Sequence, residues 1–272
     1  MKNAMEWATF AEEVVRKAGQ KIIDLKANSN IEVTYKGAGE LVTSADLASD
    51  RIIRHAISSL YPQHGILSEE NSDGIRTGNI FEGPLWIIDP LDGTVNYARN
   101  LPHFAISAAV AVDGVVWAGA VHAPELGITY VGVRGEGAFC NGEKLQVHRF
   151  ETLTEAVIGT GFPHDKDKVL PALARVNILS THCRDIRRLA APAIDICYVA
   201  SGKLDAHTES LSPWDVAAAG LIAREAGAIT GHVGEVPYDV PPDLFGEEFI
   251  CANPGIYEEL LNLLRSPKSL KS

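Results

Sequence analysis

The chain has 272 residues, of which 46% are hydrophobic and 22% are charged, and its formal net charge is −11. This length allows one large domain or two closely packed ones, and the composition is that of an ordinary globular protein. The acidic balance argues against a non-specific nucleic-acid surface or an anionic-membrane surface, so we expect no nucleic-acid partner and no membrane partner.

The four cysteines lie far apart and form no Cys-x-x-Cys pair, so they indicate neither a zinc knuckle nor a disulfide framework. A reducing cytoplasm suits them best. The N-terminus shows no secretory pattern, because charged residues interrupt its apolar positions. The longest apolar run, residues 104–112, is too short to span a bilayer. We therefore expect a soluble, cytoplasmic protein.

The chain begins with a predicted amphipathic helix. Between Trp7 and Leu25, apolar residues recur at steps of three and four, which is the helical period. A Lys-Gly-Ala-Gly loop follows at residues 36–39. It is either a plain surface connection, which is the more common case for loops, or a flap over a site.

A second helix is predicted directly after this loop. Thr43 and Ser44 are typical of a helix start, and the predicted apolar side runs from Leu47 to Leu60. Asp46 falls in the first turn, where the helix dipole favours an acid. Asp46 is therefore either a helix cap or a residue that supports a site.

Residues 65–71 predict a short strand that runs into the acid pair Glu69 and Glu70. Adjacent glutamates are usually solvated, so the pair alone marks no site. The pair matters because of the stretch that follows it in the chain.

The stretch Trp86–Asn96 reads W-I-I-D-P-L-D-G-T-V-N. Its apolar start predicts a buried strand that ends at Asp89, because the proline that follows fixes φ and lacks an N–H. Asp92, Gly93 and Thr94 come next. Two carboxylates beside a turn that can bind an anion make sense if hard cations lie between these carboxylates and a phosphate.

Beyond this stretch the chain is predicted to be β-rich up to a soft domain boundary near residue 147. A hairpin over 104–123 is followed by a strand over 128–134. The second half alternates between strands and helices. Its predicted elements are strands at 156–160, near 229 and at 249–252, and helices at 168–179, 194–200 and 257–264.

The clearest helix of the second half begins with Ser212 as a natural N-cap and Pro213 at the first helical position. Gly227 suits its C-terminal stop. Asp215 lies in the first turn, where capping alone explains an acid. The run of small residues at 217–220 indicates very close packing against a neighbouring element.

Three motifs occur in order: S-E-E at 68–70, D-P-L-D-G-T at 89–94 and W-D-V-A-A-A-G-L-I-A-R-E-A-G at 214–227. With G-E-G-A at 135–138 and G-T-G-F-P at 159–163, they cover nearly the whole chain. The chain thereby resembles the inositol monophosphatase family of metal-dependent, lithium-sensitive phosphatases.

The resemblance implies the fold of that family, a layered α-β-α-β-α sandwich like that of the fructose-1,6-bisphosphatases. It places an α+β half at residues 1–147 and an α/β half at residues 148–272. It also implies a homodimer and two magnesium ions per subunit, with room for a third.

The resemblance also implies the residues of the site. The magnesium ligands would be Glu69, Asp89, the Leu91 carbonyl, Asp92 and Asp215. These hard oxygen donors leave coordination places for water and phosphate. Glu69 and Thr94 would orient and deprotonate the attacking water, while the backbone amides of Gly93 and Thr94 would hold the phosphate together with Asp92. Asp46 and the Lys36 loop correspond to the flap region, beside the third ion.

The substrate end departs from the family pattern. Family members that use inositol phosphates contact the ring through a Gly-Ser/Thr-Ala segment and a later glutamate. Here the segment reads Ala190-Ala191-Pro192, and proline lacks the N–H that could hold a ring hydroxyl. The segment between this glutamate and Asp215 is one residue shorter here than in the family pattern. The residue at the glutamate position is therefore Glu209, or Thr208 if the one-residue gap in the alignment lies elsewhere.

The leading interpretation is a magnesium-dependent phosphomonoesterase for myo-inositol 1-phosphate or a similar small polyol or sugar phosphate. The alternative enzymes on the same fold are phosphatases whose substrate is fructose 1,6-bisphosphate, histidinol phosphate, NADP or adenosine 3′,5′-bisphosphate. From another class, the chain could be a non-catalytic metal-binding regulatory protein, although the predicted ligands are all retained. Arg187 and Arg188 either steer an anionic substrate or, as is more common, form surface ion pairs.

Overall fold

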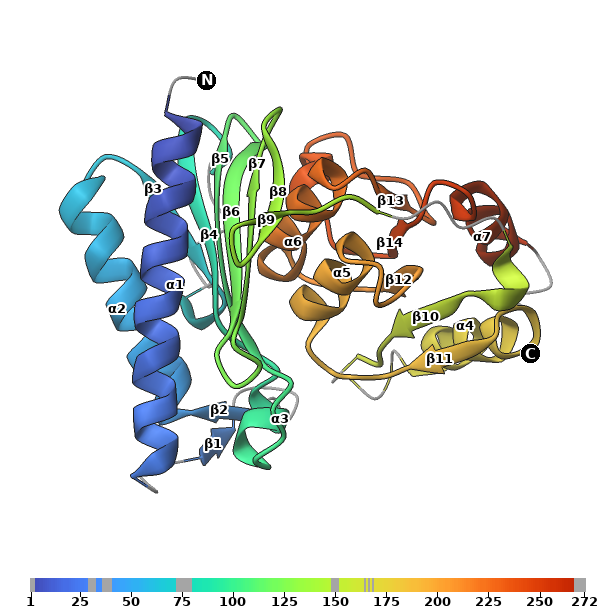
Figure 1. Ribbon diagram of the computed structural model, residues 1–272, viewed down its shortest axis with the longest axis horizontal. Coiled ribbons are helices and arrows are strands. Elements are labelled where there is room, and N and C mark those ends of the chain that lie inside the picture. Colours follow the sequence, from blue (N-terminus) through green and yellow to red (C-terminus); the bar gives the residue numbers. More distant parts are fainter. Residues whose placement is uncertain are drawn as a thin grey trace.

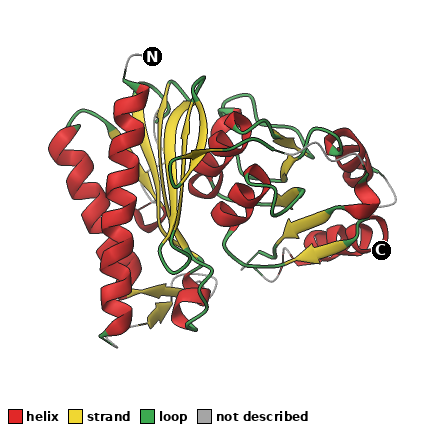
Figure 2. Cartoon of the chain, viewed as in Figure 1, coloured by secondary structure: helices red, strands yellow, loops and turns green. Residues whose placement is uncertain are grey.

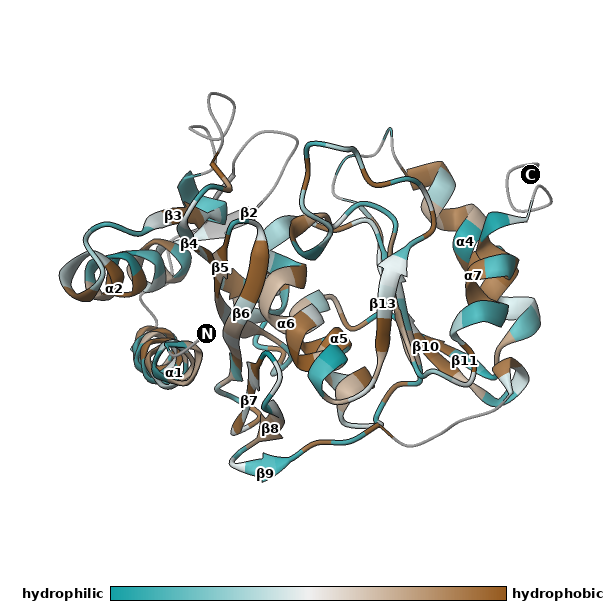
Figure 3. Ribbon diagram, turned by 90° about the horizontal axis from the view of Figure 1, so that it is seen from above, coloured by the Kyte–Doolittle hydropathy of each residue, from teal (hydrophilic) through white to brown (hydrophobic). Residues whose placement is uncertain are grey.

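The computed structural model describes residues 3–28, 33–35, 41–71, 80–147, 152–163, 165, 167 and 169–266. The helices and strands of this part of the chain lie in alternating layers (Figure 1, Figure 2). Viewed from above, the order is α1 and α2, a first sheet, α5 and α6, a second sheet, and then α4 with α7 (Figure 3).

The first layer consists of α1 (Ala4–Ala27) and α2 (Ser44–Leu60), which contact each other and the first sheet. The buried side of α1 is the predicted apolar stripe. The predicted apolar side of α2 is confirmed at Ile53 and Ile57, which are buried, and at Ile52 and Ala56, which pack against them in the core. It is wrong at its two ends, because Leu47 is 42% and Leu60 57% exposed. The helix also turns Ala45, Asp46 and Ser49 inward.

The first sheet has seven strands in the order β3-β4-β5-β6-β7-β8-β9. Only β3 and β4 run parallel, and the other neighbouring pairs are antiparallel. The strands are β3 (Gly65–Ser68), β4 (Pro84–Asp92), β5 (Ala105–Val112), β6 (Val115–Ala123), β7 (Ile128–Val133), β8 (Gly137–Cys140) and β9 (Glu143–Lys144).

The strand β4 corrects one prediction. It does not end at Asp89 but continues through Pro90 to Asp92, with a shift of register against β5 between Asp89 and Asp92. Such an irregularity accommodates a proline that cannot donate to its neighbour. A short helix, α3 (Thr94–Ala98), follows Gly93.

The middle layer consists of α5 (Pro192–Ala200) and α6 (Pro213–Glu225), and α6 lies directly on the first sheet. A Cβ atom added to Gly119 of β6 would lie 2.9 Å from the Cβ of Ala218. One added to Gly132 of β7 would lie 2.9 Å from a side-chain carbon of Ile222. The close packing predicted from the small-residue run at 217–220 is therefore present.

The second sheet has five strands in the order β11-β10-β12-β14-β13, and the outer helices α4 (Val169–His182) and α7 (Tyr257–Arg265) cover it. Its strands are β10 (Val157–Thr160), β11 (Asp185–Arg187), β12 (Ala206–Glu209), β13 (Ile229–His232) and β14 (Phe249–Ala252). The neighbours β11-β10-β12 are parallel, whereas β12-β14-β13 are antiparallel.

Several short elements were not predicted. They are β1 (Val33–Tyr35), β2 (Leu41–Thr43), β8, β9, β11 and β12. The predicted domain boundary at residue 147 falls between β9 of the first sheet and β10 of the second, and the division into two domains stays a prediction. The Lys36 loop lies outside the described residues. No helix within the described ranges is both long and apolar enough to cross a membrane.

Candidate active site

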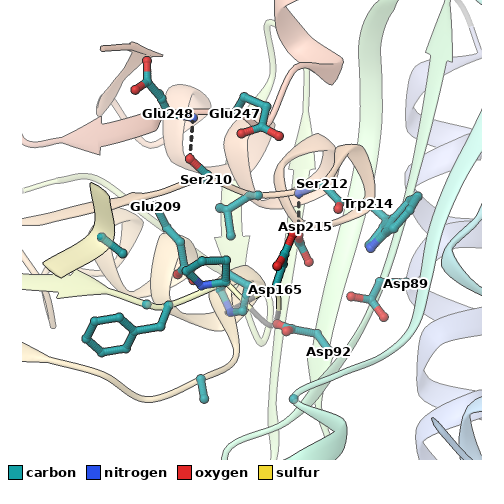
Figure 4. Close-up of a pocket in the computed structure, with 18 of the residues that line it drawn as sticks. Asp89, Asp92, Asp165, Glu209, Ser210, Ser212, Trp214, Asp215, Glu247 and Glu248 are labelled. Carbon is teal, nitrogen blue, oxygen red and sulfur yellow. Dashed lines mark hydrogen bonds between the residues drawn. The ribbon is translucent and has the colours of Figure 1, made fainter. Parts of the chain in front are cut away.

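A cavity of about 1000 Å³ lies between the two halves of the chain, and acidic side chains from several elements line it. Figure 4 shows Asp89, Asp92 and Asp215 gathered at one end, with Glu209, Glu247 and Glu248 farther away. The cavity is thus bordered by the motifs that the sequence singled out, although they are far apart in the chain.

The pairing of β3 with β4 brings Glu69 to Asp89. The two strands run parallel with Ser68 opposite Ile88, so Glu69 and Asp89 each follow directly on one of these paired residues, at the same end of the pairing. Glu69 begins a short 3-10 helix there, and both Glu69 and Asp89 line the cavity.

Each of the three clustered aspartates accepts one backbone hydrogen bond. The N–H of Leu91 donates to Oδ1 of Asp89 at 3.0 Å, and the N–H of Ala193 donates to Oδ2 of Asp92 at 2.9 Å. The N–H of Ser212 donates to Oδ2 of Asp215 at 2.8 Å, as part of the capping box that begins α6. The backbone therefore orients all three carboxylates.

Asp89, Asp92 and Asp215 each offer a carboxylate oxygen within 4.8 Å of the others. Burial raises the pKa of Asp89 well above its usual range, and the charges of Asp92 and Asp215 raise it further. Burial, followed by the charge of Asp215, does the same to the pKa of Asp92. Carboxylates held this close in a buried place repel one another unless positive charge lies among them.

A hard divalent cation fits this donor set. Three carboxylates, the nearby Glu69 and the Leu91 carbonyl are oxygen ligands of the kind that magnesium or calcium prefers. Asp89, Asp92 and Asp215 are therefore placed to hold a metal ion, and the fuller ligand set with Glu69 and Leu91 stays a prediction.

Gly93 turns the chain beside this cluster. Its φ of +86° is in the left-handed region, and a Cβ atom there would lie 3.0 Å from the carbonyl oxygen of His103. It would also lie 3.2 Å from Cβ of Ala191. Only glycine satisfies both the conformation and the close approach.

Thr94 connects the cluster to α2. Its hydroxyl oxygen lies 2.9 Å from Oδ1 of Asp46 and 3.0 Å from the carbonyl oxygen of Leu91. Asp46 is 2% exposed and caps α2, where its Oδ2 accepts from the N–H of Thr43 at 2.8 Å. Asp46 therefore has both of the roles between which the sequence left the choice open, since it caps α2 and also hydrogen-bonds Thr94 of the site.

The alternation of side chains along β12 shows which of Thr208 and Glu209 faces the cavity. Successive side chains of a strand point to opposite faces. Glu209 lines the cavity, whereas the Thr208 side chain is fully buried outside the cavity lining. Glu209 is therefore the residue of this pair that can reach a ligand.

The segment 190–192 leads into the N-terminus of α5. Ala190 and Pro192 line the cavity, and Ala191 is fully buried. Ala190 has a φ of +64°, which is uncommon for a residue with a Cβ atom. Asn96 holds the turn, because its side-chain amide donates to the carbonyl oxygen of Leu189 at 2.7 Å.

The two neighbouring arginines separate in the structure. Arg187 pairs with Asp185 at 2.6 Å on the surface, whereas Arg188 lines the cavity. Arg175 of α4, which no sequence motif indicates, also lines the cavity and donates to the carbonyl oxygen of Thr208 at 3.1 Å. Its position depends on the packing of α4, for which the sequence carries no local signal.

Comparison with known proteins identifies the family. The model of the inositol monophosphatase family matches residues 3–268. The chain belongs to this family. A protein named Nus factor SuhB from Escherichia coli K12 is 37% identical over 266 residues, which cover 96% of each chain.

Solved structures agree with the assignment to the inositol monophosphatase family. An IMPase of Thermotoga maritima is 30% identical and covers 95% of this chain and 96% of its own, with a TM-score of 0.82. An IMPase/NADP phosphatase solved with NADP and Ca²⁺ is 25% identical over 97% of both chains, also with a TM-score of 0.82. The expected layered fold is confirmed, and the chain carries it together with the acidic site of a phosphatase family.

Proposed function

We propose that this protein is a magnesium-dependent phosphomonoesterase that hydrolyses myo-inositol 1-phosphate or a similar small polyol or sugar phosphate. The observation that carries the proposal is the buried cluster of Asp89, Asp92 and Asp215 beside Gly93 and Thr94. This arrangement supplies anionic ligands for cations and, directly beside them, backbone amides for a phosphate.

The metal would be held by the carboxylates of Glu69, Asp89, Asp92 and Asp215 and by the carbonyl of Leu91. Two magnesium ions, with a third near Asp46, would supply charge neutralisation and Lewis-acid activation when bound. The other contributions come from the chain itself, and each can be assigned to a side chain or an amide.

Glu69 would accept the proton of the attacking water, since a carboxylate at the cavity edge can act as a general base. Asp46 would hold the hydroxyl of Thr94, so that the Thr94 oxygen presents a lone pair to the same water. The amides of Gly93 and Thr94 would bind the phosphate oxygens while Asp92 keeps its orientation through Ala193.

The charge of the remaining cavity lining bears on which phosphate ester the site accepts. Outside the aspartate cluster, the lining carries the carboxylates of Asp165, Asp167, Glu209, Glu235, Glu247 and Glu248 and the two guanidinium groups of Arg175 and Arg188. A second phosphate would face an excess of negative charge there, whereas hydroxyl groups would find acceptors. This favours a single phosphate on a small polyol over the bisphosphates. Of the substrate contacts predicted from the sequence, Ala190 and Glu209 line the cavity, whereas Ala191 is buried outside its lining.

NADP remains the strongest competing substrate within the family, because an IMPase/NADP phosphatase of the same fold was solved with that ligand. A panel of esters decides between the two. It contains inositol 1-phosphate, fructose 1,6-bisphosphate, histidinol phosphate, NADP and adenosine 3′,5′-bisphosphate. We expect the highest kcat/KM for the inositol ester, and a higher value for NADP would overturn this choice of substrate.

A non-catalytic regulatory protein is the second candidate. It is favoured by the relatives named Nus factor SuhB, whose name describes a factor and not an enzyme. It predicts metal binding without turnover of any ester in the panel. The retained cluster and its three backbone hydrogen bonds support the enzyme instead.

Two further properties belong to the proposal because the family resemblance implies them. Lithium should inhibit phosphate release, and the chain should form a homodimer. Inhibition is measured by titrating LiCl at fixed magnesium, and the dimer by sedimentation equilibrium. A monomer at micromolar concentration would contradict the second of these expectations.

A further inference from the structure

A row of titratable side chains runs behind the cavity and ends at Glu209. Nε2 of His103 lies 2.9 Å from Oδ1 of Asp195 in α5. Nδ1 of His207 lies 4.0 Å from Oδ2 of the same aspartate, and Nε2 of His207 lies 3.5 Å from Oε2 of Glu209. The imidazole of His207 is thus flanked by a carboxylate on each side.

His207 is the member of this row that calls for an explanation. Its side chain is fully buried, and within the described part of the chain neither ring nitrogen has a hydrogen-bond partner. A buried polar group without partners costs free energy, so such groups are rarely retained without a compensating interaction. The polar groups that face the two ring nitrogens are the carboxylates of Asp195 and Glu209, at 4.0 and 3.5 Å.

Two glycines make room for this pair, Gly159 in β10 and Gly161 directly after it. Gly159 lies opposite His207 in the parallel register, and a Cβ atom there would lie 2.7 Å from Nδ1 of the ring. A Cβ atom on Gly161 would lie 1.9 Å from Oε1 of Glu209. His207 and Glu209 share one face of β12, so the Gly-Thr-Gly segment leaves a slot for both side chains.

We propose that His207 is a positioning residue, which holds Glu209 for the hydroxyl groups of the substrate alcohol. The inference rests on the proposed function, because it concerns the substrate end of the same cavity. The buried ring lies between Asp195 and Glu209, with Nε2 3.5 Å from Oε2 of Glu209, and so limits where that carboxylate can move. Glu209 lines the cavity, where its oxygens can accept hydrogen bonds from hydroxyl groups. His207 thereby sets the preference for polyol esters over esters of alcohols without hydroxyl groups.

The kinetic test compares myo-inositol 1-phosphate with 4-nitrophenyl phosphate. His207→Met removes the polar ring that faces Glu209 and should raise KM for the inositol ester about tenfold, as expected for a lost polar contact to a charged group. The kcat of His207→Met for the inositol ester and its KM for the nitrophenyl ester should stay within about twofold of the wild type. Both values depend on the acidic cluster and the phosphate, and not on the contact between His207 and Glu209. His207→Gln keeps an amide donor and should restore most of the affinity.

Thr208→Val is the matched control, because it changes the adjacent side chain on the opposite face of β12. It should leave both KM values unchanged. Gly161→Ala is an independent variant that keeps His207 but displaces Glu209 through its new Cβ atom, and it should raise KM for the inositol ester alone. The proposal is overturned if His207→Met leaves the ratio of the two KM values unchanged, or if Thr208→Val alters it equally.

A second readout needs no catalysis. In protein labelled with ¹⁵N-histidine, the ring resonances of His207, assigned through the His207→Met variant, should shift in Glu209→Gln. Unshifted resonances would overturn the contact and the proposal, whether or not the esters are hydrolysed. If the wild type hydrolyses neither ester, the proposed function fails and the kinetic role of His207 fails with it, even where the NMR contact is present.

Discussion

The backbone N–H of Ala193 donates a hydrogen bond to Oδ2 of Asp92 at 2.9 Å. Asp92 ends β4 of the first sheet, and Ala193 lies in the first turn of α5, in the layer between the sheets. The bond therefore joins the two sides of the cavity at a residue of the acidic cluster. With the corresponding bonds to Asp89 and Asp215, it keeps the carboxylates in place without help from a ligand.

This arrangement predicts how the metal-free protein responds to pH. Burial, reinforced by neighbouring carboxylates, raises the pKa of Asp89 and Asp92 well above the usual range. A carboxyl with a raised folded-state pKa binds its proton more tightly when folded, so its stabilising contribution is present below the unfolded pKa of about 4. That contribution is lost as the pH rises through the folded-state value. In EDTA, the free energy of unfolding should therefore fall as the pH approaches neutrality.

The measurement is urea unfolding in EDTA at a series of pH values. Asp92→Asn should reduce the decline, because it removes one of the buried charges and relieves Asp89. Glu143→Gln, an exposed position, is the control and should follow the wild type. Equal slopes for the wild type and Asp92→Asn would show that the cluster carries no such repulsion.

The contact between Thr94 and Asp46 predicts a catalytic effect with little effect on folding. Thr94→Val removes the hydroxyl that lies 2.9 Å from Asp46. We expect kcat to fall by about 100-fold, at the lower end of the range for groups that assist proton transfer, with KM nearly unchanged. Thr94→Ser keeps the hydroxyl and should retain most of the rate. Steady-state kinetics check this, and a Val variant with the wild-type kcat would contradict it.

The backbone of Ala190 predicts a stabilising substitution. Its φ of +64° costs an alanine about 1–2 kcal/mol, whereas glycine adopts this conformation freely. The greater freedom of glycine in the unfolded chain offsets about 0.5–1 kcal/mol of that gain. Ala190→Gly should therefore raise the free energy of unfolding by roughly 0.5–1 kcal/mol. Urea unfolding measures it, and a lower stability than that of the wild type would be the contrary result.

Much of the fold and the site was predictable where local chemistry is decisive. Ser212 and Pro213 mark the start of α6, and Asp215 then falls on the side that closes the cavity. The short apolar strand before Asp89 was also predicted. These features depend on caps, turns and apolar periodicity, which a sequence carries within a few residues.

Other features depend on tertiary packing, and the sequence did not reveal them. The strand β12 reads A-H-T-E and has no apolar alternation, because the face that carries His207 and Glu209 lines a polar slot. Without that strand, the choice between Thr208 and Glu209 stayed open. The strand β4 continues past Pro90 because its register shifts, which also depends on its neighbour β5.

Phosphate release from myo-inositol 1-phosphate by the wild type and by Asp92→Asn, each with magnesium and with EDTA, decides whether the carboxylate cluster is the centre of a phosphatase. We predict release by the wild type only with magnesium, and background rates for Asp92→Asn under both conditions although its circular dichroism spectrum is that of the wild type. Release that continues in EDTA, or that survives in Asp92→Asn, would contradict a phosphatase built on this carboxylate cluster.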